Sequence, residues 1–314
     1  MRIAIVTDST CDLPQDLIFQ YNIREVPLRV IMQGKVSYDN RYDFDRSDYY
    51  KQLLNGKEQA RFEAPTVDEF VQVYKKICLE ADAVLSIHES SRLSDTVKNA
   101  RAAALQAKDS IKKMRNQKNI GIPFQVSVID SQVTSIGTGL IVLRAAEIIT
   151  RQVSFRRLSN ALEKLAEQIF FYAIPSEPAY LRAAKEITKI SLLEAGIATF
   201  TDQKPIAMIH KGQFKLLEKV KGYDAAIAET SKRLLTQLQE RRSYEKVGFV
   251  FSGNTNKLDE ISAVLQAKTE LASMGLGSVV GTMNPTLARY LGPNAIGMSI
   301  INDDISVTDL AEIK

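Results

Sequence analysis

The chain has 314 residues, of which 45% are apolar and 25% charged, and its formal net charge is +4. This apolar content can fill the core of one large or two ordinary domains, and no apolar run approaches the roughly 20 residues of a membrane-spanning helix. The mild basic excess and the absence of tryptophan do not favour nucleic-acid binding, which needs a dense basic patch with interleaved aromatic side chains.

The residue types of metal and redox chemistry are scarce. The chain has two cysteines and two histidines, and Cys11 and Cys78 stand far apart with no ligand pattern around them. We therefore expect no disulfide, no metal site and no cofactor. The N-terminus enters a strand directly, without the basic region, long apolar stretch and cleavage site of a signal peptide, so we expect a cytoplasmic protein.

Strand-like and helix-like segments alternate through the first half of the chain. Thr66 and Glu69 have the spacing of a capping box, which places the start of a helix there. The alternation predicts a mostly parallel sheet with helices on both faces. The expected strands are residues 2–7, 83–87 and 125–130, and the expected helices are residues 64–81, 94–117, 139–150 and 154–169.

The second half adds a hairpin to the same kind of alternation. Lys211 and Gly212 are typical of a tight turn between two strands, so the second sheet should be mixed. The fold class is therefore α/β with two domains, residues 1–165 and residues 166–314. The expected strands are residues 170–175, 197–200, 205–210, 213–217, 247–253, 277–281 and 295–301, and the expected helices are residues 178–190, 223–242, 256–271 and 285–291.

Five strand ends carry clustered hydroxyls and small residues. Their sequences are "TDST" at 7–10, "HESSRLSDT" at 88–96, "DSQVTSIGTG" at 130–139, "FSGNTN" at 251–256 and "GTMNPT" at 281–286. Each cluster can be read simply as a helix cap. Because ligands of open α/β sheets bind beyond the carboxyl ends of strands, the recurrence also predicts a shared polar cleft. Hydroxyls and backbone amides in such a cleft suit a carboxylate or a phosphate.

Several of these segments resemble the DegV family, in family order across nearly the whole chain. They include "VTDSTCDLPQDLIFQYNIREVPLRVIMQGKVSYDN", "ADAVLSIHESSRLSDTVKNA", "VSVIDSQVTSIGTGLIVLRAAE", "KPIAMIHKGQ" and "GSVVGTMNPT". The resemblance implies a two-domain α/β protein that binds a long-chain fatty acid between its domains. It also implies a carrier, not a catalyst, that presents the fatty acid to an ATP-dependent kinase subunit.

The sequence departs from the family pattern around the expected head group. Phe62 and Glu63 stand near the family's head-group threonine, and Met283 replaces the histidine that the family associates with kinase function. Ser91 and Ser94 match the family's serine-rich loop, and Arg92 fills its variable position. The resemblance thus favours a divergent member of the family.

The predicted ligand contacts combine the strand ends with these family positions. They are Ser9, Phe62, Glu63, Ser91, Arg92, Ser94, Ser131, Thr282 and Met283. One alternative is an enzyme that acts on a small acid or phosphate through Asp8, Asp130 and His88. Another is a scaffold protein whose binding site has decayed. A fatty acid found in the purified protein would favour the carrier over both.

Overall fold

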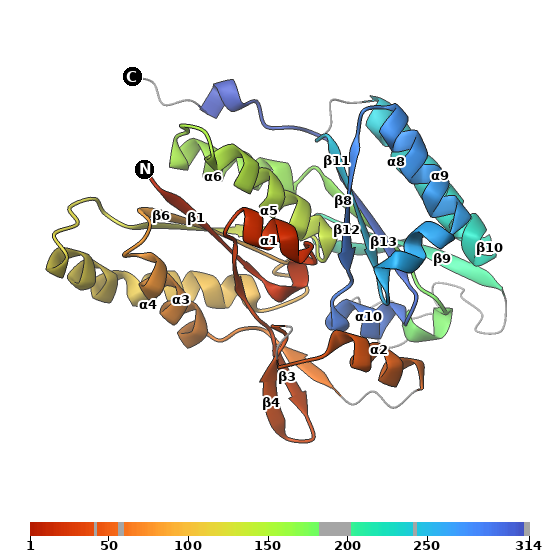
Figure 1. Cartoon of the computed structure of the whole chain (residues 1–314), viewed down its shortest axis with the longest axis horizontal. Coiled ribbons are helices and arrows are strands. Elements are labelled where there is room, and N and C mark those ends of the chain that lie inside the picture. The colour runs from red at the N-terminus through yellow and green to blue at the C-terminus, as the bar shows by residue number, and fades with distance from the viewer. Residues whose placement is uncertain (41–42, 56–59, 182–201, 241–243, 311–314) are drawn as a thin grey trace.

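The structure is a computed structural model that describes residues 1–40, 43–55, 60–181, 202–240 and 244–310. Its described strands form sheets of four, six and three strands (Figure 1). The four-stranded sheet comes from the first half of the chain and the six-stranded sheet from the second. This division confirms the predicted α/β fold class.

The four-stranded sheet is parallel throughout, in the order β2-β1-β6-β7. Its strands are β1 (Ile3–Asp8), β2 (Arg24–Val26), β6 (Ala83–His88) and β7 (Gln125–Asp130). One face packs against α3 (Val67–Ile77) and α4 (Thr96–Gln117), and the other against α5 (Ile136–Ile149) and α6 (Phe155–Ala166). The predicted doubly covered parallel sheet is therefore confirmed.

Side chains alternate between the two faces along each strand of this sheet. On β6, Val84 packs with the α3 and α4 side chains, whereas Leu85 and Ile87 pack with α5. The expected capping box at the start of α3 is present, with Thr66 and Glu69 each bonding the other's backbone. This cap fixes where α3 begins and therefore which face its apolar side chains cover.

The six-stranded sheet is mixed, in the order β10-β9-β8-β13-β11-β12. Among its described strands, only the β11 and β12 pair is parallel. Its strands are β8 (Ile169–Ile174), β9 (Gln203–His210), β10 (Gln213–Lys221), β11 (Lys246–Phe251), β12 (Gly277–Thr282) and β13 (Ile296–Ile301). The predicted hairpin is confirmed, because Lys211 and Gly212 both have positive φ, 50° and 68°, as a two-residue hairpin turn requires.

Helices α8 (Tyr223–Glu240) and α9 (Ser262–Ser273) cover one face of the six-stranded sheet. The helix expected over residues 178–190 begins as a short 3₁₀ turn, Pro178–Tyr180, and most of its remainder lies outside the described residues. The strand expected at 197–200 also lies outside them. The helix expected over 256–271 is divided into a 3₁₀ segment, Thr255–Glu260, and α9.

The three-stranded sheet was not predicted from the sequence. It is antiparallel in the order β4-β3-β5, with β3 (Arg29–Met32), β4 (Lys35–Tyr38) and β5 (Arg61–Glu63). The short helices α1 (Gln15–Gln20) and α2 (Arg46–Leu54) belong to the same part of the chain. In Figure 1, this small sheet projects from the side of the molecule that also carries α2 and α10 (Pro285–Leu291).

Helix α5 packs between the two large sheets and holds them together. It contacts β1 and β6 on one side and β8, β11 and β13 on the other. Eleven of its fourteen residues are buried, as expected for a helix that is apolar on all sides. Gly248 on β11 permits this approach, since a Cβ there would lie 2.7 Å from Ile136 Cγ1.

The chain after β1 is wedged between α5 and β12. A Cβ on Gly139 of α5 would lie 2.4 Å from the Cys11 carbonyl oxygen, and one on Gly281 of β12 would lie 1.8 Å from that of Asp12. Glycine at both positions therefore lets the backbone at Cys11 and Asp12 pack directly against helix α5 and strand β12. We propose the domain boundary at residues 165 and 166, in the last turn of α6 and shortly before β8.

Replacing Gly281 by alanine should destabilise the protein by about 1–3 kcal/mol, because the new methyl group would overlap the Asp12 carbonyl. Urea unfolding followed by circular dichroism measures this change. Gly121→Ala is the control, since nothing lies within 4 Å of a Cβ there. Equal midpoints for the two variants would contradict the close contact.

Candidate ligand-binding cavity

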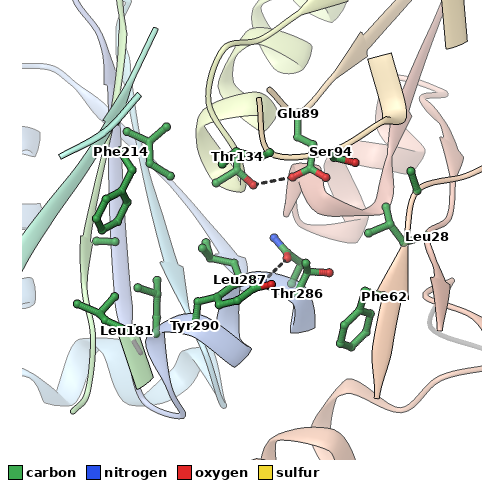
Figure 2. A pocket seen from close by; sticks show the side chains of 16 residues that line it. Leu28, Phe62, Glu89, Ser94, Thr134, Leu181, Phe214, Thr286, Leu287 and Tyr290 are labelled. Atoms are coloured by element: carbon green, nitrogen blue, oxygen red, sulfur yellow. Dashed lines mark hydrogen bonds between the residues drawn. The ribbon is translucent and has the colours of Figure 1, made fainter. Parts of the chain in front are cut away.

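A cavity opens between the two large sheets, beside α10 and the three-stranded sheet (Figure 2). The volume in which the centre of a water molecule fits is about 160 Å³. All of the empty space between the walls, including the open mouth, is about 910 Å³. The smaller figure is the one comparable with the cavities of known small-molecule sites, and it lies below their usual range of roughly 300–1,000 Å³. The residues that line it are Leu28, Phe62, Ala64, Glu89, Leu93, Ser94, Thr134, Ala173, Leu181, Ile209, Phe214, Asn284, Thr286, Leu287, Tyr290 and Leu291.

Most of the cavity wall is apolar. In Figure 2, Leu181 and Phe214 flank one side, and Leu28 and Phe62 flank the other. The first pair belongs to the half of the chain that forms the six-stranded sheet, and the second pair to the segment of the small sheet. A hydrocarbon chain in this space would therefore contact both halves of the protein.

Five polar side chains lie together in the lining, and we call them the polar patch. They are Glu89, Ser94, Thr134, Asn284 and Thr286. They come from three places in the chain: the loop after β6, the loop before α5 and the beginning of α10. All three places follow strand ends, as the polar sequence clusters predicted.

Glu89 is the acidic member of the polar patch. Its side chain is buried, and Thr134 Oγ1 donates a hydrogen bond of 3.1 Å to Glu89 Oε2 (Figure 2). The pKa of Glu89 is raised to about 8, because burial and the nearby Asp8 carboxylate outweigh the hydrogen bonds from Thr134 and Ser94 that lower it. At neutral pH this group is therefore mostly a neutral acid.

The Asp12 carboxylate holds the cavity wall in place. Its Oδ2 accepts hydrogen bonds from Ser135 Oγ at 2.5 Å, from the Asn284 backbone N–H at 3.0 Å and from Asn284 Nδ2 at 2.9 Å. The Asn284 side-chain oxygen in turn caps α10 through the Leu287 N–H at 2.9 Å. The pKa of Asp12 is raised to about 7, because burial outweighs the Arg46 guanidinium and these donors, which lower it.

Arg46 compensates the buried charge of Asp12. Its Nη1 lies 3.5 Å from Asp12 Oδ1, and its Nε and Nη2 bind the two oxygens of Asp39 at 2.8 and 2.7 Å. It also donates to the carbonyl oxygens of Ser9 at 2.8 Å and Thr282 at 3.4 Å. Burial alone would lower the pKa of Arg46, but the two carboxylates outweigh burial and raise it.

The residues proposed for the enzyme alternative lie away from the cavity. His88 Nδ1 bonds Asp8 at 2.9 Å and its Nε2 bonds Ser86 at 2.7 Å, and all three side chains are fully buried. The His88 ring contacts Phe70 of α3, so it lies on the sheet face opposite α5. Asp130, on the far side of β6, binds Ser91 instead. The structure therefore separates the two aspartates and presents none of these groups in the cavity lining.

Two of the nine predicted ligand contacts, Phe62 and Ser94, line the cavity. Ser94 Oγ also bonds Thr96 Oγ1 at 2.8 Å, at the start of α4. Ser9 lies behind the wall, where its Oγ accepts the Leu28 N–H at 3.1 Å. Phe62 and Ser94 therefore border the cavity directly, and Ser9 contacts it only through Leu28, which is a lining residue.

Four other predicted contacts lie elsewhere in the first half of the chain. Ser131 is buried, where its Oγ bonds Thr138 at 2.8 Å. Glu63 pairs with Arg29 at 3.0 Å. Ser91 and Arg92 are exposed. None of these four belongs to the described cavity lining.

Thr282 and Met283 lie on the β12 side of the Arg46 network. Thr282 borders a second, more open groove together with Arg46 and residues of α2. The Met283 side chain is fully buried, and its carbonyl oxygen accepts a hydrogen bond from the Tyr50 hydroxyl. Neither side chain belongs to the described lining of the cavity.

The sequence analysis did not select four members of the polar patch: Glu89, Thr134, Asn284 and Thr286. All four lie inside the quoted strand-end clusters, so their positions in the sequence indicated them, whereas their residue types did not.

Among the described residues, no group of three or more His, Cys, Asp or Glu side chains is arranged to hold a metal ion. In the same part of the chain, no helix has both the length and the hydropathy to cross a bilayer.

The comparisons with known proteins all point to the same family. The family model described as "Uncharacterised protein, DegV family" matches residues 2–303. A DegV domain-containing protein of Caldanaerobacter subterraneus subsp. tengcongensis is 29% identical over 303 residues, which cover 95% of this chain and 98% of that protein.

Two solved structures share the fold over almost the whole chain. A DegV family protein from Thermus thermophilus, described as binding fatty acid, is 26% identical with a TM-score of 0.74 and covers 96% of this chain and 100% of its own. DegV from Bacillus subtilis, described as a fatty acid binding protein, is 22% identical with a TM-score of 0.78, at the same coverages of 96% and 100%.

Replacing Arg46 by methionine should destabilise the protein by about 3–5 kcal/mol, because it leaves the buried carboxylates of Asp12 and Asp39 without their cation. Denaturant unfolding at neutral pH measures the loss. The matched control is Arg24→Met, which breaks the exposed pair with Glu80 and should cost about 0–1 kcal/mol. A similar small loss for both variants would show that the Arg46 network does not stabilise the fold.

Proposed function

Since this chain belongs to the DegV family, we propose that it binds a long-chain fatty acid in the cavity between its two large sheets. The carboxyl head contacts the polar patch, and the hydrocarbon tail lies among the apolar walls. The observation that carries this proposal is the composition of the lining, in which a small group of hydrogen-bonding side chains adjoins a much larger apolar surface.

The energetics of burial fit an acyl chain. Each buried methylene contributes about 0.8 kcal/mol, so about fifteen methylenes would contribute about 12 kcal/mol before the costs of association. The head group then needs only to be oriented and kept hydrogen-bonded, at about 1.5–3 kcal/mol for each charge-assisted bond. Ser94 in the polar patch and Phe62 on the wall are the predicted contacts that this proposal retains.

The proposal assigns binding, not chemical conversion. A nucleophile or general base must reach its substrate within hydrogen-bond distance. The described cavity lining offers hydroxyls, an amide and one acid, whereas His88 and its partners are buried on the opposite face of the sheet. The fatty acid would accordingly leave the cavity unchanged, and the protein would act as a carrier.

The proposal extends to a partner, an ATP-dependent kinase subunit that phosphorylates the bound carboxylate, as the family resemblance implies. Met283 has no titratable group, so it could not serve this step as the family's histidine does. Mixing the loaded protein with a kinase subunit of the family and ATP tests this part. Acyl phosphate trapped as a hydroxamate would support it, and no trapped product would confine the protein to binding.

Filling the cavity should abolish ligand retention. Ala64 lines the cavity and is half-buried directly after β5, so Ala64→Trp places a large ring in the proposed path of the tail without entering the core. Organic extracts of the denatured wild-type protein should contain a long-chain fatty acid by mass spectrometry. Extracts of Ala64→Trp should contain at least tenfold less.

Ala102→Trp is the matched control, because Ala102 is exposed on α4 and does not line the cavity. It should retain as much fatty acid as the wild type. Wild-type protein that is empty on extraction and gains no melting temperature from added oleate would contradict the proposed function and favour a scaffold role.

A further inference from the structure

We propose that Glu89 binds the ligand's carboxyl head as a neutral acid, so that the complex holds one proton between the two carboxyl groups. This inference rests on the proposed function, because it takes the ligand to be a fatty acid. It assigns the head-group contact to a residue of the polar patch that the sequence analysis did not select.

The described part of the lining contains an acid but no cation. Among the described residues that border the cavity, Glu89 carries the only carboxyl group, and none is a lysine, arginine or histidine. A fatty-acid carboxylate placed there would meet hydroxyls, an amide and the Glu89 carboxyl group. Two carboxyl groups in contact cannot both ionise at low energetic cost, so they share a proton.

The neighbours of Glu89 also favour its neutral form. Asp8 of β1 lies against it, since Asp8 Oδ2 is 3.4 Å from the Glu89 backbone nitrogen. His88 is bound to that same aspartate, and Asp12 adds a second negative charge nearby. Tyr290 of α10 is the other titratable group in the described lining. Burial and the nearby negative charges together raise the pKa of Glu89 to about 8.

The geometry leaves this proton available to a ligand. Thr134 Oγ1 donates to Glu89 Oε2, so that oxygen accepts while the acid proton can be carried on Oε1 (Figure 2). Thr286 Oγ1, in the same cavity, is buried with no hydrogen-bond partner among the described residues. A carboxylate between them would accept one hydrogen bond from the acid and one from this hydroxyl.

The proton balance gives binding a defined pH dependence. Below pH 8 the ligand anion meets Glu89 already protonated, and binding takes up no proton. Above pH 8 free Glu89 is an anion, so the complex forms only with uptake of one proton from solution. The dissociation constant should then rise by up to tenfold for each pH unit.

The Glu89→Gln variant separates the hydrogen bond from the proton. Its amide still donates to a carboxylate but does not titrate. The wild-type acid has a folded-state pKa of about 8, above its ordinary value of 4.5, so its contribution to stability is complete below 4.5 and is lost as pH rises through 8. The variant should therefore melt close to the wild type at pH 5 and above it at pH 9, which also reports that it folds.

Isothermal titration calorimetry with laurate, from pH 6 to pH 9, tests the inference. The wild-type dissociation constant should be level to pH 8 and then rise, with nearly one proton taken up at pH 9 in buffers of different ionisation enthalpy. Glu89→Gln should bind at pH 6 within about threefold of the wild type and stay level to pH 9. The control Glu80→Gln, an exposed carboxyl outside the cavity lining, should keep the wild-type rise.

The outcomes distinguish the two proposals. Wild-type protein that does not bind laurate at pH 6 would overturn the proposed function and this inference with it. Binding that is level to pH 9, that takes up no proton, or that keeps its rise in Glu89→Gln would overturn the role of Glu89 alone. The wild-type proton uptake decides the matter even if the variant does not fold.

Discussion

The contacts of the buried Asp12 carboxylate hold the two halves of this protein together. It accepts hydrogen bonds from the first residue before α5 and from the residue that caps α10, and it faces the Arg46 guanidinium from α2. The segment that carries it fits between α5 and β12 only because glycines stand at the two points of contact. One side chain thus joins a strand end of the parallel sheet to a helix of the mixed sheet.

This network explains why the cavity can persist between the sheets. Buried charges must be paired and hydrogen-bonded, so the positions of Asp12, Arg46 and Asp39 are fixed by one another. Asn284 belongs both to this network and to the cavity lining. The polar contacts of Asp12, Arg46 and Asn284 therefore hold the cavity wall in place. The apolar lining residues need not pack against one another across the cavity to keep the two domains together.

The sequence predicted the large sheets because their signals are local. Alternating apolar strands, the capping box at Thr66 and the turn at Lys211 all specify structure within a few residues. The three-stranded sheet was missed, since its strands are only three or four residues long and have little periodicity. The polar strand ends marked segments that contribute to the cavity lining. They could not show which side chains face it, because that depends on how α10 and α5 approach each other.

The contrast between His88 and Glu89 shows how that choice is made. They are consecutive, yet His88 points at Phe70 of α3 while Glu89 lines the cavity on the other side. Successive side chains at a strand end project to opposite faces, so a shift of one residue would exchange them. With the imidazole turned inward, the group left to meet a ligand is an acid surrounded by negative charge. In the proposed complex such a cavity would recognise a carboxyl head through a retained proton, where an arginine would recognise it through opposite charge.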